Sequence, residues 1–355
     1  MLKTKEGGMK KELFGTTKTG ETASCYELEN KNGMKVVVTD YGATVVSAYV
    51  KDKTGNLVDV VLGYDNLEAY ERGTSYFGAT IGRCANRISD AKITIEGAEY
   101  QLEANDNENC LHSGSEGTAD KVWRVKDFSD NSITFEVEDA DLQQGYPGNA
   151  VMAVTYEVTD ENGLLIKYFG KADKTTIFNL TNHSYFNLNG HNSGSVYETM
   201  LQINASHYTP VKNSKAIPTG EIVPVAGTPF DFTVAKPIGQ DIGVEFDQLT
   251  YGNGYDHNFA IDKTSDGVEL VATAIGDKTG IKMEVFTDTV GIQLYSANFI
   301  EGQQGKEGAV YHNRGAFCLE TQYFPNSINE PNFVTPITKC GEEYKSQTEY
   351  RFSVE

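Results

Sequence analysis

Alternation of apolar and polar residues predicts β-strands over much of the chain. Residues 26–29 and 34–39 flank one Asn-Gly turn, and residues 151–158 and 164–169 flank another. An Asn-Gly pair between two alternating segments is typical of a β-hairpin. Residues 281–286 alternate strictly between apolar and polar, as expected of a strand with one buried face. These patterns predict an all-β protein.

Helical patterning is sparse along the chain. The one clear helix start is at Asp65, which is placed to cap a helix with Glu68 reaching back to it, but the apolar pattern ends by Gly73. We expect only a turn or two of helix there. So many strands cannot remain one flat open sheet, because twist and exposed edges favour a large sandwich or barrel. The sequence lacks the repeat of roughly 20 to 50 residues that marks a propeller or solenoid.

Composition and charge narrow the classes of function. The 355 residues are 39% hydrophobic and 23% charged, and their formal net charge is -20. That charge disfavours a nucleic-acid partner or an anionic membrane surface, both of which attract basic proteins. No segment approaches the roughly 20 apolar residues of a membrane span, and the N-terminus lacks the apolar run of a secretory signal. We therefore expect a cytoplasmic protein.

The chain carries no sign of a linker, a disulfide framework or a familiar cofactor motif. Its prolines are dispersed and no Gly/Ser/Pro tract interrupts it, which favours a single domain over residues 1–355. Its five cysteines are odd in number and scattered, so we expect reduced thiols. Nucleotide-binding glycine loops, a serine-hydrolase elbow, Cys-x-x-Cys pairs and His-Glu-x-x-His are absent from the sequence. The sequence alone leaves open a metal site built from scattered His and Asp residues.

Two segments combine polar donors with glycines in a way that does not suit an apolar core. Residues 81–88 contain Arg83, Asn86 and Arg87, and a guanidinium beside an amide can clamp a hydroxyl-rich ligand as well as form a surface ion pair. Residues 107–114 form a polar loop that delivers one imidazole, His112. Both segments are candidates for a ligand site.

A third segment, residues 178–188, has two distinct faces if it is a strand. Leu180, Asn182, Ser184 and Phe186 would share one face, while the other face would be entirely polar or amphipathic; its residues are Asn179, Thr181, His183, Tyr185 and Asn187. A solvated face more often carries Lys and Glu than these residue types. We therefore expect this face to line a polar pocket.

Three later segments supply further candidates. Asp256 lies in residues 255–259, which we expect to begin a strand after a glycine-rich loop, and Gln293 lies in residues 291–299. In residues 316–327, Glu320 shares a strand face with Cys318 and is flanked by apolar neighbours. Partial desolvation raises the pKa of a carboxylate toward the range useful to a general base, so Glu320 is a candidate base.

These motifs together resemble the aldose 1-epimerase (galactose mutarotase) family. The resemblance runs in order from about residue 41 to residue 352, and its most specific parts are residues 179–188 and 319–322. The other matching segments are residues 83–88, 109–112, 218–222, 230–232 and 255–259, with Pro325. Two departures are Ser113, where a second glycine is usual, and Ser296-Ala297, where Thr-Gly is more typical.

The resemblance implies a large antiparallel β-sandwich whose concave face binds a free aldohexose, without a metal or cofactor. It implies that Glu320 is the general base and His183 the general acid. His112 would then lie near the ring oxygen and anomeric centre. The residues expected to hold sugar hydroxyls are Asn86, Arg87, Asp256 and Gln293. The resemblance leaves open whether the protein is a monomer or a homodimer.

The expected chemistry agrees with these residue types. Opening the hemiacetal removes a proton from the C1 hydroxyl and adds one to the ring oxygen, so a base and an acid must act at neighbouring oxygens. We expect attraction between the carboxylate and the imidazole to favour the protonated ring. Three alternatives remain: an epimerase for a hexose 6-phosphate, a glycosidase that uses Asp256 and Glu320, and a sugar-binding module without catalysis.

Overall fold

Strands dominate the computed structural model of the protein, which describes residues 4–6 and 9–355. The first six strands form an antiparallel sheet in chain order, each paired with the next. Their bounds are β1 Thr4–Glu6, β2 Met9–Thr16, β3 Thr22–Glu29, β4 Lys35–Thr39, β5 Thr44–Lys51 and β6 Leu57–Asp59.

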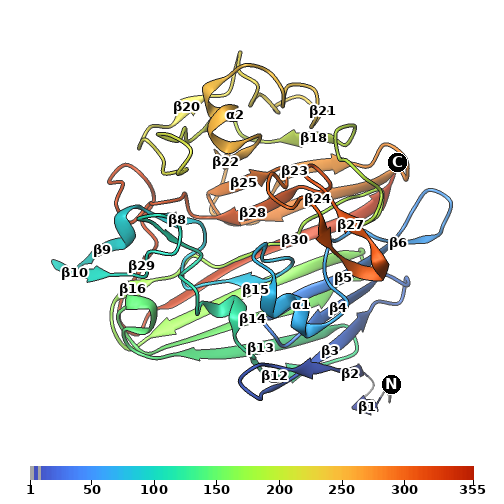
Figure 1. Cartoon of the computed structure of the whole chain (residues 1–355), viewed down its shortest axis with the longest axis horizontal. Coiled ribbons are helices and arrows are strands. Elements are labelled where there is room, and N and C mark those ends of the chain that lie inside the picture. The colour runs from blue at the N-terminus through green and yellow to red at the C-terminus, as the bar shows by residue number, and fades with distance from the viewer. Residues whose placement is uncertain (1–3, 7–8) are drawn as a thin grey trace.

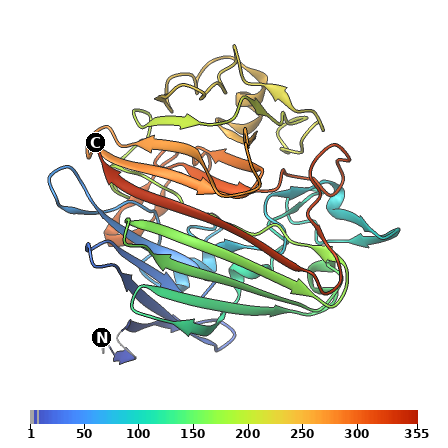
Figure 2. The ribbon, with the colours of Figure 1, turned by 180° about the vertical axis from the view of Figure 1, so that it is seen from behind.

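A nine-stranded antiparallel sheet crosses the face of the molecule that Figure 2 presents to the viewer. Its strands in spatial order are β12 Arg124–Phe128, β13 Ser132–Asp139, β14 Ala150–Val158, β15 Gly163–Ala172, β30 Glu343–Val354, β24 Ile281–Thr287, β23 Glu269–Ile275, β18 Met200–Ile203 and β21 Lys236–Pro237. The C-terminal strand β30 therefore lies in the middle of the sheet, between strands from two distant parts of the chain.

A five-stranded sheet carries residues from the second half of the chain. Its order is β20 Val223–Pro224, β19 His207–Tyr208, β22 Asp256–Ala260, β25 Gly291–Tyr295 and β28 Cys318–Gln322. One continuous core cluster joins this sheet and the six-stranded sheet to the nine-stranded one. The ring of Tyr26 packs against Phe135, and the hydroxyl of Tyr350 donates to the carbonyl of Leu319. The protein is thus a β-sandwich with the long sheet as one layer (Figures 1 and 2).

Short pairs of strands and short helices complete the described part of the chain. The pairs are β7 Thr80–Ile81 with β17 Thr181–Asn182, β8 Arg87–Ile88 with β11 Cys110–Leu111, β9 Lys92–Ile95 with β10 Ala98–Gln101, β16 Thr176–Ile177 with β29 Ile337–Thr338, and β26 Gln303–Gln304 with β27 Val310–Tyr311. The helices are α1 Leu67–Arg72, α2 Asp247–Gly252 and the 3₁₀ turns η1 Ser89–Ala91, η2 Thr118–Asp120, η3 Gln143–Gly145 and η4 Lys306–Gly308.

The predicted all-β class and both predicted hairpins are confirmed. The turn at residues 31–33 joins β3 to β4, and the turn near Asn162 joins β14 to β15. Strand β24 alternates between buried and half-buried residues along its whole length, because only one face of this strand packs into the core. The protein contains no helix, among the residues that the structure describes, long and apolar enough to cross a membrane.

Two details of the helix prediction are wrong. The N-cap of α1 is Asn66 rather than Asp65, since the Asn66 side chain accepts a hydrogen bond from the Ala69 amide at 3.0 Å. With the cap one residue later, Glu68 stands in the first turn and pairs with Arg72 instead of reaching back. Helix α2 was not predicted at all, because it spans six residues, has no side-chain cap and ends in a glycine-rich stretch.

Residues 178–188 do not form the continuous strand that their pattern suggested. Within this segment only Thr181–Asn182 forms a strand, which pairs with β7. Elsewhere in the segment, Asn179 and Phe186 form isolated β-bridges with other parts of the chain. Asn182 lies buried and donates to the Gly78 carbonyl at 2.8 Å. The segment is enclosed on both sides, so both of its faces are buried. Of the polar face that we expected to line a pocket, His183 and Tyr185 line a cavity, whereas the other three residues do not.

Candidate active site

A polar cavity of about 220 Å³ lies where the five-stranded sheet meets the loops around β7, β8 and β11. Its lining residues are Thr74, Ser75, Tyr76, Asn86, Arg87, Leu111, His112, His183, Tyr185, Asp256, Tyr295, Phe299 and Glu320. Six of the seven residues proposed from the sequence are among them. They come from five separate stretches of the chain, so only the fold brings them together.

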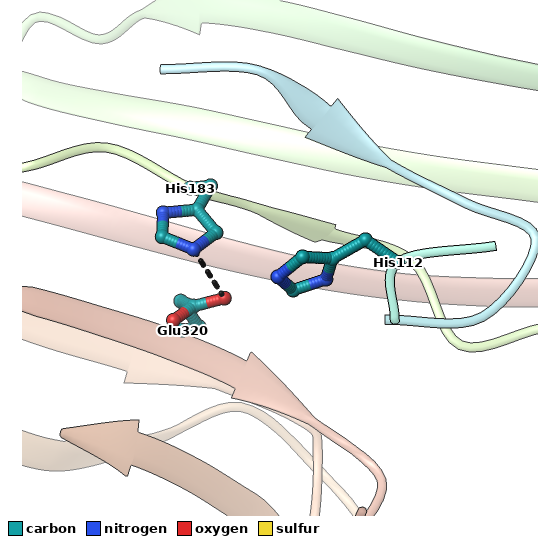
Figure 3. Close-up of side chains that lie close together, drawn as sticks. All are labelled: His112, His183 and Glu320. Atoms are coloured by element: carbon teal, nitrogen blue, oxygen red, sulfur yellow. Dashed lines mark ion pairs between the residues drawn. The ribbon is translucent and has the colours of Figure 1, made fainter. Parts of the chain in front are cut away.

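Glu320 lies in the middle of β28, with its carboxylate directed toward the two imidazoles (Figure 3). Strand alternation places Leu319 in the core and turns Glu320 toward the cavity. The residue is only 2% exposed, and its Oε2 atom is buried without a hydrogen-bond partner among the described residues. Burial raises the pKa of this carboxyl well above 4.5, the nearby Asp256 raises it further, and Arg87 opposes both.

His183 faces Glu320 from the segment after β17. Its Nε2 atom lies 3.6 Å from Oε2 of Glu320. The ring stacks on Tyr185, with centroids 5.1 Å apart, and more distantly on Tyr76 at 6.1 Å. These contacts fix the plane of the imidazole, so its two nitrogens have defined directions.

The protonation state of His183 differs from the expectation. Burial lowers the pKa of this imidazole to about 4, against a smaller opposing effect of a hydrogen bond with its own backbone. Desolvation therefore outweighs the attraction of Glu320, whose own pKa is raised by the same burial. Burial thus favours the uncharged form of each group, a protonated carboxyl and a neutral imidazole.

His112 lies edge-on to His183, with ring centroids 5.2 Å apart. Its Nδ1 accepts the Asn86 amide proton at 3.1 Å, so the neutral ring carries its proton on Nε2 and offers a hydrogen-bond donor. Burial lowers the pKa of this histidine well below 6.5, with His183 and Arg87 adding to the effect. His112 is therefore a neutral imidazole across the physiological range.

The two histidines and Glu320 also form a cluster of possible metal ligands. His112, His183 and Glu320 each offer one ligand atom, and these atoms lie within 4.8 Å of one another. Ligation through Nε2 of His112 would move its proton to Nδ1, where the Asn86 amide already donates. The hydrogen bond from Asn86 thus disfavours the tautomer that a metal needs, and the donor set fits a metal poorly.

Asn86, Arg87 and Asp256 also line the cavity. The Arg87 Nε donates to Asp106 at 2.7 Å, and its Nη1 lies 3.7 Å from Asp256 Oδ2. Burial raises the pKa of Asp256, an effect that Arg87 and a hydrogen bond from Gln293 oppose. A fixed guanidinium next to a carboxylate offers both donors and acceptors to neighbouring hydroxyls.

Gln293, the seventh proposed residue, lies behind the cavity wall rather than on it. Its amide nitrogen donates to Asp256 Oδ1 at 2.8 Å, and its Oε1 accepts from Gln322 at 3.3 Å. The side chain is 3% exposed. In this structure Gln293 orients Asp256, and its register opposite Glu320 on β25 places it beneath the site.

Arg83 does not reach the cavity. Its guanidinium is fully buried, pairs with Asp139 and donates to the carbonyls of Pro147 and Gly148. The neighbouring Arg87 points the other way into the site, so the two arginines of this segment do not converge on one ligand.

Several wall residues were not proposed from the sequence. Tyr185 and Tyr295 lie within the segments that were singled out, but their aromatic character alone did not separate them from core residues. Tyr76 has a positive φ of 55° in the short connection between α1 and β7, a conformation that no sequence pattern indicates. The exposed Phe299 follows Ala297, whose φ of 49° explains why glycine is usual at that position.

Comparison with known proteins places this chain in one family. The aldose 1-epimerase family model matches residues 24–351. The chain is 40% identical over 344 residues to the galactose mutarotase of Sus scrofa, covering 96% of this chain and 98% of that protein. It is 35% identical over 338 residues to the aldose 1-epimerase of Escherichia coli K12, covering 95% and 97%. The chain belongs to the aldose 1-epimerase family.

Solved structures agree with this assignment. An aldose epimerase homologue from C. elegans superposes with a TM-score of 0.86 at 29% identity, covering 94% of this chain and 99% of that one. The galactose 1-epimerase from Lactobacillus acidophilus NCFM gives a TM-score of 0.84 at 27% identity, with 98% of both chains covered. The sandwich that positions the cavity is therefore the mutarotase fold.

Proposed function

We propose that this protein is an isomerase, an aldose 1-epimerase that interconverts the α and β anomers of free aldohexoses such as galactose and glucose. The observation that carries the proposal is the approach of His183 Nε2 to Glu320 Oε2, 3.6 Å apart in a polar cavity. One sugar hemiacetal presents two oxygens on its anomeric carbon, so a base and an acid this close together can address both.

In the proposed mechanism Glu320 accepts the proton of the C1 hydroxyl while His183 donates a proton to the ring oxygen. The C1–O5 bond breaks and an open-chain aldehyde forms. Rotation about C1–C2 turns the other face of the carbonyl to the oxygen at C5. The ring then closes with the two groups in exchanged roles, and the pair ends with the same single proton that it held at the start.

The required ion pair forms by moving that proton within the pair. Before the sugar binds, burial favours the protonated carboxyl and the neutral imidazole. Transfer to Nε2 of His183 yields the carboxylate and imidazolium that ring opening needs. A bound sugar supports this transfer, since its C1 hydroxyl donates to the carboxylate and its ring oxygen accepts from the imidazolium.

The other cavity residues bind and orient the sugar in this proposal. Asn86, Arg87 and Asp256 hold hydroxyls on one side of the ring, with Gln293 fixing Asp256 from behind. His112 donates its Nε2 proton near the ring oxygen, where negative charge develops as the ring opens. The proposed chemistry needs no organic cofactor, because proton transfer to and from the two oxygens is enough to open and close the hemiacetal.

Polarimetry tests the proposal directly. Freshly dissolved α-D-galactose and α-D-glucose change optical rotation slowly on their own, and the protein is expected to accelerate that change in proportion to its concentration. Absence of acceleration with both sugars would overturn the proposal. Release of sugar from an aryl glycoside, lost in Asp256→Asn, would instead favour a glycosidase.

Free sugars are favoured over hexose 6-phosphates by the charges around the cavity. Among the described residues its wall carries one guanidinium, that of Arg87, which already pairs with Asp106 and Asp256. The Arg83 guanidinium is turned away into a buried pair with Asp139. Phosphate recognition depends on Arg or Lys side chains with free donors. Comparison of kcat/KM for glucose and glucose 6-phosphate decides between the two substrates.

We also propose a cytoplasmic location and a single domain that spans residues 1–355. The core cluster shared by the three large sheets supports the single domain. We expect the protein to act as a monomer or homodimer on its small sugar substrate, without a nucleic-acid or membrane partner, as the net charge of -20 suggests.

A further inference from the structure

The second nitrogen of the His183 ring has a partner that the mechanism above does not use. The Sγ atom of Cys318 lies 3.7 Å from Nδ1 of His183, within the range of a hydrogen bond to sulfur. The thiol is fully buried. Cys318 precedes Glu320 by two residues on β28, so both side chains leave the same face of one strand and reach opposite nitrogens of one imidazole.

The direction of this hydrogen bond follows from the state of the pair. In the imidazolium that the proposed mechanism needs, both ring nitrogens carry protons, so the Nδ1–H group can only donate to the Cys318 sulfur. Burial raises the pKa of the Cys318 thiol well above its ordinary value, so the sulfur keeps its proton and accepts as a neutral thiol. The resulting order is Glu320 carboxyl, Nε2, Nδ1–H and Cys318 sulfur.

We propose that Cys318 is a positioning residue that fixes the Nδ1–H tautomer of His183. With Nδ1 permanently protonated and held by the sulfur, Nε2 is the only ring nitrogen that gains and loses the catalytic proton. When the proton moves from Glu320 to Nε2, the imidazolium still donates Nδ1–H to the same sulfur. The thiol therefore serves both protonation states without moving, and this inference rests on the roles proposed above for Glu320 and His183.

The aromatic rings around His183 cannot replace this function. Tyr185 and Tyr76 stack on the flat faces of the imidazole and fix its plane, but a stacked ring does not distinguish between the two nitrogens. An isolated neutral imidazole populates both tautomers. The hydrogen bond of His183 with its own backbone remains when the sulfur is lost, so we expect a mixture in which the competent Nδ1–H form is only a fraction.

Nitrogen NMR of the ¹⁵N-histidine-labelled full-length protein tests the tautomer without reference to activity. In the wild type near pH 7, the His183 signals, assigned with His183→Asn, are expected to show a protonated Nδ1 and a bare Nε2. In Cys318→Ala the two nitrogens are expected to move toward averaged chemical shifts. A wild-type ring protonated on Nε2 would overturn the proposal, whatever the enzyme's rate.

Kinetics of matched variants supply the second test. Cys318→Ala is expected to lower kcat about three- to tenfold with KM for galactose unchanged, and to move the acidic limb of the kcat–pH profile to lower pH, because the imidazolium has lost an acceptor. Cys318→Ser restores a group that both donates and accepts, and its kcat is expected to lie within about twofold of the wild type.

Cys110→Ala is the control for loss of a buried thiol. Cys110 is 1% exposed and its sulfur contacts the Tyr146 hydroxyl outside the cavity. The unfolding midpoint of every variant is measured alongside, so that misfolding is detected. Equal kcat and pH profiles for Cys318→Ala and Cys110→Ala, or a serine variant as slow as the alanine variant, would refute the role of the sulfur. Absence of mutarotation in the wild type would refute the proposed function and leave the NMR result standing.

Discussion

Replacement of Glu320 by glutamine removes the proposed base while preserving the size and polarity of the side chain. Asp256, the other carboxylate of the cavity lining among the described residues, cannot take over because Gln293 and Arg87 hold it. Proton transfer by a positioned side chain is worth about 10² to 10⁴ in rate, which corresponds to about 3 to 5 kcal/mol in the activation barrier. We expect kcat to fall by that factor with KM changed less than about threefold.

The assay is the initial rate of optical rotation for fresh α-D-galactose, corrected for spontaneous mutarotation. Glu136→Gln is a matched control, since Glu136 is also a buried glutamate, 4% exposed, but pairs with Arg124 and Lys126 away from the cavity. Its kcat is expected to equal that of the wild type even if its stability falls. A Glu320→Gln enzyme with kcat within about threefold of the wild type would refute the base assignment.

The same geometry leads to three more expected outcomes. His183→Asn is expected to lower kcat at least about 100-fold while calorimetry shows nearly unchanged galactose binding; equal losses would make it a binding residue. Asp256→Asn is expected to raise KM about tenfold with a smaller effect on kcat, because a charge-assisted bond to a sugar hydroxyl is weakened; an unchanged KM would remove it from the sugar site. Burial raises the folded-state pKa of Glu320 above 4.5. The stability that its protonated carboxyl contributes is therefore fully present below pH 4.5. This stability is lost as the pH rises toward the folded-state pKa, at about 1.4 kcal/mol for each pH unit in that window. Thermal unfolding should therefore show Glu320→Gln gaining stability over the wild type with increasing pH; a constant difference would mean that the carboxyl is not desolvated.

The all-β fold class could be predicted from the sequence because the patterns that specify its strands and turns are local. Strict alternation at β24 and Asn-Gly turns before β4 and β15 specify hairpins without reference to the rest of the chain. The Asn66 cap and helix α2 were missed for the opposite reason. A one-residue displacement of a cap changes no pattern, and a six-residue helix has too few positions to show a period.

Sequence motifs pointed to the residues of the candidate site. The pKa values of those residues, in contrast, depend on how the folded chain packs around them. The sequence correctly indicated a desolvated Glu320, because Phe317 and Leu319 flank it locally. It could not show that Tyr76 and Tyr185 enclose His183 and help to lower its pKa to about 4 by burial. These rings come from different segments of the chain. Where both partners of an ion pair are desolvated, their mutual attraction shifts the pKa of the imidazole less than the loss of water does.

Side-chain direction was equally hard to predict. Arg83 and Arg87 look equivalent in the sequence, yet the first turns into a buried pair with Asp139 and only the second reaches the cavity. Gln293 lies one strand from Glu320 and was expected to touch the sugar, but the structure aims its amide at Asp256. The direction of a side chain at such positions is set by partners that are distant in the chain.

A crystal structure of Glu320→Gln soaked with D-galactose tests the central claim most directly. The account predicts the C1 hydroxyl within hydrogen-bond distance of the residue 320 amide and the ring oxygen facing Nε2 of His183. A sugar bound with its anomeric carbon turned toward Arg87 and Asp256, away from both groups, would contradict it.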